Sequence, residues 1–472
     1  MVFASSIFLY CFLPLFLGLY YLTPRGWKSV TLALASYLFY GWWRPDFVAL
    51  MLISTAVDYT AGRRITAARR AAHEPSGEGP RPGKRWLVLS CVVNLGLLAY
   101  FKYAGFGVET LNSLLGQLGF EEVSWTSVVL PVGISFYTFQ TLSYTIDVYQ
   151  GTAPPVQRLR DFICYVAMFP QLVAGPIVRY GTIAEQLRSR THSVSLFFQG
   201  VLAFQAGLAK KVLIADQLAP LADEAFAAGS LGTLDAWLGT LAYTFQIYFD
   251  FSGYSDMAIG LGLMLGFRFP INFEQPYRSV SITDFWRRWH ISLSSFLRDY
   301  LYISLGGNRR GKLRTYVNLA LTMLLGGLWH GAAWTFVAWG AYQGLWLVIE
   351  RLAGKRALHA FLPRPGQIAI TFVLAMVGWV FFRAVDISSA LQHLSSMFGA
   401  GAAAGAGQAL GLRPLHVLTF IAASVIVWGL PTTQAQVSRP RMPFVLGLQV
   451  LFLLALVQLH HADHVPFLYF QF

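Results

Sequence analysis

YVNLALTMLLGGLWHGAAWTFVAWGAYQGLWLVI is the sequence of residues 316–349, and His330 is the one residue in it whose side chain titrates near neutral pH. An ionisable side chain at membrane depth is costly, and it usually lines a cavity or takes part in chemistry. The small residues Gly326-Gly327 and Gly331 flank it, which allows close helix packing or leaves room for a substrate. The stretch therefore predicts two apolar helices that meet in a turn at Trp329-His330.

The composition places the whole chain in a membrane. Of its 472 residues, 56% are hydrophobic and 12% are charged, whereas soluble proteins carry about 25% charged residues. Its apolar runs approach the roughly 20 residues that a membrane-spanning helix needs. We therefore expect an all-α, polytopic membrane protein that forms a single domain over residues 1–472.

The net charge of +13 has the same explanation. The basic residues lie in short segments between apolar runs, where the positive-inside rule predicts them on the cytoplasmic side. This pattern indicates membrane lipids, and not nucleic acid, as the partner. The three cysteines show neither a disulfide framework nor the spacing of a metal site.

Apolar runs divide the chain into expected membrane spans. These lie at about 3–22 (an uncleaved first helix), 29–43, 46–61, 86–102, 315–329, 331–349, 366–382, 415–431 and 443–459. The loop 62–85 is rich in arginine and lysine, which predicts a cytoplasmic location for it and places both termini outside. The Ala/Gly-rich stretch 399–411 is expected to be an external loop.

The middle of the chain, residues 126–273, is less regular. Pro131, Pro170, Gly253 and Pro270 interrupt its apolar runs, so we expect short, tilted or re-entrant helices there. Two carboxylates, Asp250 and Asp256, flank Gly253. They could form a proton or ion path, but we favour the interpretation that they cap a helix break.

A second histidine, His290, lies in the amphipathic stretch Ser281–Tyr302, which is rich in Trp and Arg. Without chemistry, this stretch would be an interfacial helix anchored by its aromatic and basic side chains. Alternatively, Arg287 and Arg288, with the basic turn at 306–312, could contact the phosphates of a donor such as coenzyme A. The positive-inside rule explains the same charges without a ligand.

His330 also has two interpretations. It could be a packing residue that is hydrogen-bonded to a neighbouring helix, or a general base, since a neutral imidazole suits that role near pH 7. Three other polar positions carry less weight. Asp147 and Asp284 are isolated carboxylates, and residues 460–464, HHADH, have metal-like spacing but read better as an exposed polar end. We therefore predict no metal site.

Six stretches and the C-terminus together resemble the membrane-bound O-acyltransferase family, and within it the bacterial polysaccharide O-acetylation proteins. They are Gly133–Gln140, Phe169–Ile177, Gly207–Lys211, Phe249–Asp256, Trp286–Ser294, Gly327–Gly331 and Phe467–Phe472. Ser304 departs from this branch, which usually has proline there, and the loop 62–85 is longer than expected.

The resemblance implies a ring of about nine to twelve transmembrane helices, with short re-entrant helices, around a central funnel. It also implies two functional histidines, because the family's invariant histidine corresponds to His330 and its second position to His290. Further side chains are expected to line the donor channel: Trp329, Trp286, Arg287, Arg288, Ser292 and Asn318.

The implied activity is acyl transfer across the bacterial inner membrane. A cytoplasmic donor, expected to be acetyl-CoA, would supply an acetyl group for an exported polysaccharide such as alginate, directly or through a periplasmic acetyltransferase partner. His330 would act as general base or accept the acyl group itself, and His290 would orient the donor or stabilise its oxygen. No bound cofactor is expected.

Other functions remain open at this point. Peptidoglycan could be the acceptor of the same acetyl group, or D-alanine could be transferred from a carrier protein to teichoic acid. A transporter or flippase of a polysaccharide precursor would also use broken helices and buried acids. The chain could also be an export scaffold, in which both histidines would be packing residues without chemistry.

Overall fold

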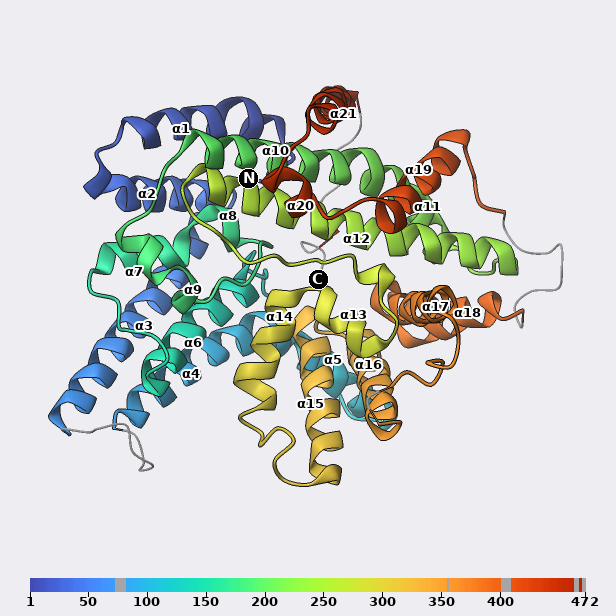
Figure 1. The fold of residues 1–472 in the computed structure, drawn as a ribbon. Helices are drawn as coiled ribbons and strands as arrows, with labels where there is room; N and C mark the ends of the chain where they lie inside the picture. The colour runs from blue at the N-terminus through green and yellow to red at the C-terminus, as the bar shows by residue number, and fades with distance from the viewer. Residues whose placement is uncertain (73–81, 355, 400–408, 462–466, 469–472) are drawn as a thin grey trace. The chain divides into compact units, whose positions relative to one another are not determined.

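The computed structural model describes residues 1–72, 82–354, 356–399, 409–461 and 467–468, and its elements there are all helices (Figure 1). The all-α prediction is therefore confirmed. The chain divides into two compact units, Met1–Gly200 with Leu261–Pro270, and Val201–Gly260 with Ile271–Phe472. The predicted external loop at 399–411 and the C-terminal polar cluster fall largely outside the described residues.

The first unit contains both short and long helices. In chain order they are η1 (Phe8–Phe12), α1 (Leu13–Leu22), η2 (Arg25–Trp27), α2 (Lys28–Gly41), α3 (Asp46–Ala71), α4 (Lys84–Leu98), η3 (Ala99–Tyr103), α5 (Ala104–Gln117), α6 (Ile134–Gln150), α7 (Leu159–Ala167), α8 (Phe169–Leu172) and α9 (Tyr180–Arg188). Helix α10 (Val194–Lys210) starts here and continues into the second unit.

The first part of the predicted loop at 62–85 is wrong, because it belongs to helix α3. The helix continues to Ala71, through residues that the loop was expected to contain, because Ala and Arg are good helix formers. Arg69 lies on this extension and donates through Nη1 to the carbonyl oxygen of Val148 at 3.1 Å, near the end of α6. The basic side chains at 63–70 therefore belong to a helix end, and residues 73–81 lie outside the described residues.

The second unit contains the two histidine stretches. After α10 its helices are η4 (Lys211–Ala215), α11 (Asp216–Ala227), α12 (Thr233–Met264), η5 (Pro276–Arg278), α13 (Ile282–Arg288), α14 (Ile291–Phe296), η6 (Leu297–Tyr302), α15 (Lys312–His330), α16 (Trp334–Leu352), α17 (Arg364–Arg383), α18 (Ile387–Met397), α19 (Pro414–Ser424), η7 (Val425–Gly429), α20 (Thr433–Ser438) and α21 (Met442–His461).

Helix α12 shows that the predicted helix break at Gly253 is wrong. The helix runs unbroken over 32 residues, and a Cβ atom added at Gly253 would lie 2.7 Å from the carbonyl oxygen of Gly207. The glycine therefore lets α10 and α12 cross closely. Asp250 and Asp256 do not cap a break but form ion pairs, with Lys211 at 2.8 Å and Lys210 at 2.6 Å.

Helices α15 and α16 form an antiparallel pair whose turn carries His330 (Figure 1). Glycine allows their backbones to approach. A Cβ atom at Gly340 would lie 2.5 Å from the carbonyl oxygen of Met323, and one at Gly344 would lie 3.3 Å from Ala320 Cα. The predicted turn at Trp329-His330 is confirmed, since α15 ends at His330 and α16 begins at Trp334.

We expect a Gly340→Ala substitution to separate these two helices. Its methyl group meets backbone atoms of α15, and overpacking of this kind typically costs about 1–3 kcal/mol. The thermal unfolding midpoint of the detergent-solubilised protein should fall by several degrees. Gly447→Ala in α21 is the matched control, because nothing lies within 4 Å of an added Cβ there. An unchanged midpoint for Gly340→Ala would contradict the close packing.

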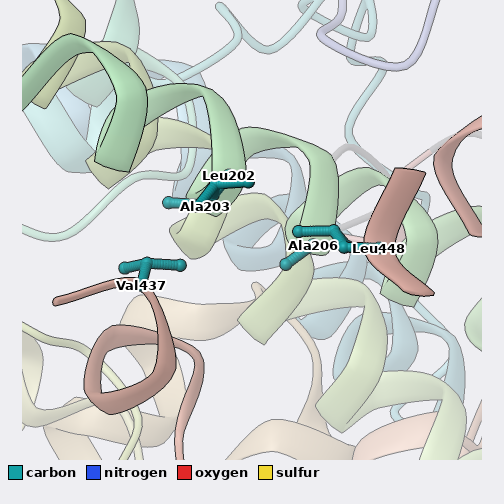
Figure 2. Close-up of a cluster of buried hydrophobic side chains, with 5 residues drawn as sticks. All are labelled: Leu202, Ala203, Ala206, Val437 and Leu448. Carbon is teal, nitrogen blue, oxygen red and sulfur yellow. The ribbon is translucent and has the colours of Figure 1, made fainter. Parts of the chain in front are cut away.

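Several helices have the character of membrane spans. Among the described residues, four helical segments are long and apolar enough to cross a membrane: Lys84–Gln117, Val194–Ala227, Arg364–Arg383 and Met442–His461. Figure 2 shows how two of them pack, with Leu202, Ala203 and Ala206 of α10 in one buried cluster with Val437 of α20 and Leu448 of α21.

Candidate functional site

His330 is the last residue of α15, and its side chain is buried. Its ring lies among aromatic side chains, with centroid distances of 5.2 Å to Trp339 of α16 and 5.3 Å to Phe382 of α17. Gly331 follows in an extended conformation, and a Cβ atom there would overlap the ring of Phe336. The turn after the histidine therefore requires a residue without a side chain.

His290 lies at the junction of α13 and α14 in a left-handed conformation, with φ 43° and ψ 54°. Such a conformation is uncommon outside glycine, and it is found where surrounding contacts enforce it. Here the segment 272–274 supplies them: Asn272 O accepts from Ile291 N, and Glu274 N donates to Arg288 O, both at 2.9 Å. The ring of His290 is fully buried.

Asn272 fixes the ring of His290. Its Oδ1 lies 3.1 Å from His290 Nδ1 and accepts from the Ser292 hydroxyl at 2.8 Å, while its Nδ2 donates to Ser255 Oγ at 3.1 Å. An amide oxygen is an acceptor only, so the imidazole carries a proton on Nδ1 and a lone pair on Nε2 when it is neutral. Ser292, an expected channel residue, therefore belongs to the support of His290.

The two histidines lie close together inside one unit. Their ring centroids are 6.3 Å apart, and Trp329 approaches both, at 6.1 Å from His290 and 5.1 Å from His330. Phe251 of α12 packs edge-on against His290 at 4.7 Å. The surroundings are thus apolar and contain two titratable nitrogen heterocycles, an arrangement that suits proton transfer in a water-poor site.

Helix α13 is anchored to α16 from two directions. Both oxygens of the Glu350 carboxylate accept backbone N–H groups at the start of α13, from Ile282 at 2.7 Å and Thr283 at 2.9 Å. Trp286 donates through Nε1 to Gln343 at 3.2 Å and packs against Trp339, the neighbour of His330. Trp286 is therefore linked to the histidine pair through one aromatic ring.

The remaining expected channel residues have other positions. Arg287 is exposed, and Arg288 pairs with Asp284, an N-terminal residue of its own helix, at 3.0 Å. Asn318 donates to the carbonyl oxygens of Gly307 and Leu305 and so holds the turn before α15. It lies twelve residues, or about 18 Å of helix, before His330.

Sequence reasoning missed Asn272, Gln343 and Glu350, because each is a single polar residue whose partner is distant in the chain. It also missed the C-terminal docking. Leu468 donates its backbone N–H to Asp250 at 2.9 Å, and Phe467 stacks on Tyr254 at 4.6 Å. The available sequence signal for Asn272 was its position as a single polar residue in the run Pro270–Phe273.

The remaining polar candidates form no metal centre within the described part of the chain. His460 and His461 each place Nδ1 2.8 Å from a carbonyl oxygen of their own helix, and the other residues of the HHADH cluster lie outside the described ranges. Asp147 lies in α6 of the first unit.

The chain belongs to the membrane-bound O-acyltransferase family, whose model matches residues 156–385, a range that includes both histidines. It is thus a membrane-embedded acyltransferase. A probable alginate O-acetylase of Pseudomonas putida is 47% identical over the full length of both chains, and one of Azotobacter vinelandii is 54% identical over 85% of this chain and 79% of its own. A peptidoglycan O-acetyltransferase of Helicobacter pylori is 37% identical over 84% and 80%.

Proposed function

We propose that this protein transfers acetyl groups for the O-acetylation of an exported polysaccharide, with alginate as the acceptor. Two buried imidazoles, 6.3 Å apart in an aromatic enclosure, are the observation that carries the chemical part. The proposal of alginate as the acceptor rests on the relatives. Two of them match most of the chain at 47% and 54% identity and are named as probable alginate O-acetylases.

His330 acts as the general base in this proposal. It takes the proton of the acceptor hydroxyl while the hydroxyl oxygen attacks the thioester carbonyl carbon. The carbon–sulfur bond then breaks, the thiolate leaves, and the proton held by His330 passes to the sulfur. The ring's aromatic neighbours exclude water, which would otherwise compete with the acceptor and hydrolyse the thioester.

His290 serves the same reaction as a proton acceptor or orienting group. Stabilising the thioester oxygen, as expected from the resemblance, would need a hydrogen on Nε2. The contact between Asn272 Oδ1 and His290 Nδ1 instead favours a neutral ring with its hydrogen on Nδ1. We therefore assign His290 to hold the hydroxyl group or the proton through Nε2, with Asn272 as its positioning residue.

The donor in this proposal is acetyl-CoA on the cytoplasmic side of the bacterial inner membrane, with both chain termini outside. The acetyl group emerges on the periplasmic side, where a partner acetyltransferase or the sugar hydroxyl itself receives it. Support comes from the basic residues between apolar helices, which the positive-inside rule assigns to the cytoplasm. The exposed Arg287 lies next to the histidine stretch and suits the approach of an anionic donor.

We expect deletion of this protein to remove acetyl esters from exopolysaccharide and to leave those of the cell wall unchanged. Mass spectrometry of both polymers, with and without the gene, measures this directly, and complementation with the wild-type chain is the control. Loss of acetyl groups from peptidoglycan alone would reassign the acceptor, and the similarity to a peptidoglycan O-acetyltransferase is the reason to measure both. Loss of D-alanine esters would reassign the donor as well.

A further inference from the structure

The first unit contains a polar cavity of about 390 Å³, and none of the residues assigned to acyl transfer lines it. Its walls come from the end of α9, the turn at 189–193, the first turns of α10 and the residues after α12, Gly266 and Arg268. Ligand pockets commonly have volumes of about 300–1,000 Å³. The cavity is therefore large enough for a small phosphorylated molecule or a lipid headgroup.

The charge of this cavity is positive. Arg190 and Arg268 line it, and its other lining side chains are uncharged. Within the described residues neither arginine forms an ion pair with a carboxylate, and the nearby Asp161 lies 4.0 Å from Arg160 instead. Two guanidinium groups in a cavity whose lining contains no carboxylate favour an anionic occupant.

Arg190 is held in place through Nε and Nη1, and its Nη1 also donates to the carbonyl oxygen of Gln186 at 3.5 Å. Its Nε donates to the Tyr20 hydroxyl at 2.9 Å and its Nη1 to Ser29 Oγ at 3.3 Å, while the ring of Phe267 lies 4.6 Å from the guanidinium carbon. Its Nη2 is buried and makes no hydrogen bond within the described residues. Arg190 therefore contributes a fixed positive charge to the wall of the cavity.

The backbone around the cavity is also suited to an anion. Helix α10 begins there, with Ser193 Oγ accepting from Leu196 N at 3.2 Å, and the positive end of a helix attracts phosphate groups. Gly266 has φ +82°, and a Cβ atom on it would lie 2.8 Å from the carbonyl oxygen of Thr191. The backbone of Arg268 is held in place, because its main-chain N–H donates to Gln186 Oε1 at 2.7 Å.

The neighbouring side chains have the character of a membrane–water interface. Tyr20, which holds Arg190, ends the apolar helix α1, and Lys28 Nζ lies 4.4 Å from the centroid of its ring. Tyrosine and lysine are typical of this depth. We propose that the cavity binds the phosphate group of an anionic ligand, and that this ligand is the headgroup of an anionic phospholipid.

Lipid binding to purified full-length protein in detergent tests the proposal. Short-chain phosphatidylglycerol should raise the thermal unfolding midpoint in a saturable way. Arg268→Glu should raise the half-saturating lipid concentration about tenfold or more. Arg188→Glu is the matched control, because Arg188 is an exposed arginine of α9 that does not line the cavity. It should keep the wild-type affinity.

Parallel titrations with coenzyme A and inorganic phosphate distinguish the sources of the phosphate. Saturation by coenzyme A but not by the lipid, lost in Arg268→Glu, would support the phosphate site and overturn the lipid assignment. Equal lipid affinity in wild type and Arg268→Glu would overturn the site itself. These experiments measure ligand binding and not acetyl transfer. Their outcome is therefore independent of whether the proposed function is correct.

Discussion

Replacement of His330 by alanine should reduce acetylation of the exported polysaccharide by about 10²–10⁴-fold, the usual contribution of a general base. The variant should still insert into the membrane at normal levels, because the ring of His330 packs among aromatic side chains at the end of a helix. Acetyl ester content, divided by the amount of protein in the membrane fraction, is the quantity to measure.

His393→Ala is the matched control for this experiment. His393 is also a buried histidine of the second unit, where it lies 2.9 Å from Thr240 Oγ1 and stacks on Phe226 at 4.2 Å. We expect its loss to lower stability and to leave the activity per folded molecule unchanged. If His330→Ala acetylates as well as His393→Ala, His330 is a packing residue and the proposed mechanism is wrong.

Asn272→Ala should have the second largest effect, a fall of kcat by about 10–100-fold, by analogy with the loss of the hydrogen-bond partner of a metal-ligating histidine. The KM for the thioester should change little, since Asn272 contacts the ring nitrogen of His290 and not a substrate-facing surface. Steady-state kinetics of the purified protein separate these two quantities. Asn272→Asp should restore part of the rate, because its carboxylate also accepts from Nδ1.

A purely structural role for Asn272 predicts a different outcome. Asn94 offers the comparison, because it is another buried asparagine, and its amide donates to both carboxylate oxygens of Asp58. Asn94→Ala should lower the unfolding midpoint with kcat per folded molecule maintained. If Asn272→Ala behaves in the same way, or if Asn272→Asp restores stability without rate, the positioning role is contradicted.

Periodicity and composition predicted several helices, but not those of the middle of the chain and not the polar contacts between helices. Apolar runs predicted α2, α15, α16, α17 and α21 closely, since a spanning helix must satisfy its own backbone and bury apolar side chains. Gly253 misled the prediction, because glycine serves close helix packing as well as helix breaks. Only the position of α10 against α12 distinguishes the two uses.

The histidine pair could be predicted in part. The apolar context singled out His330, and the family resemblance added His290, whereas spacing alone gave no sign that the two rings approach each other. Asn272 lies eighteen residues before His290 in the chain, and Glu350 lies at least sixty-seven residues after the backbone groups that it binds. Their roles therefore depend on tertiary contacts. Arg288 and Asn318 make local bonds, which the sequence did not indicate, and their place in the donor channel stays a prediction.

The most direct test of the account is thioester turnover by the purified protein in liposomes, with acetyl-CoA and alginate oligosaccharide as the substrates. We predict that the wild-type protein releases one free thiol for each acetyl ester formed, and that His330→Ala releases neither above the level of empty liposomes. Transport of the oligosaccharide without thiol release, or equal thiol release by His330→Ala, would contradict acyl transfer at the histidine pair.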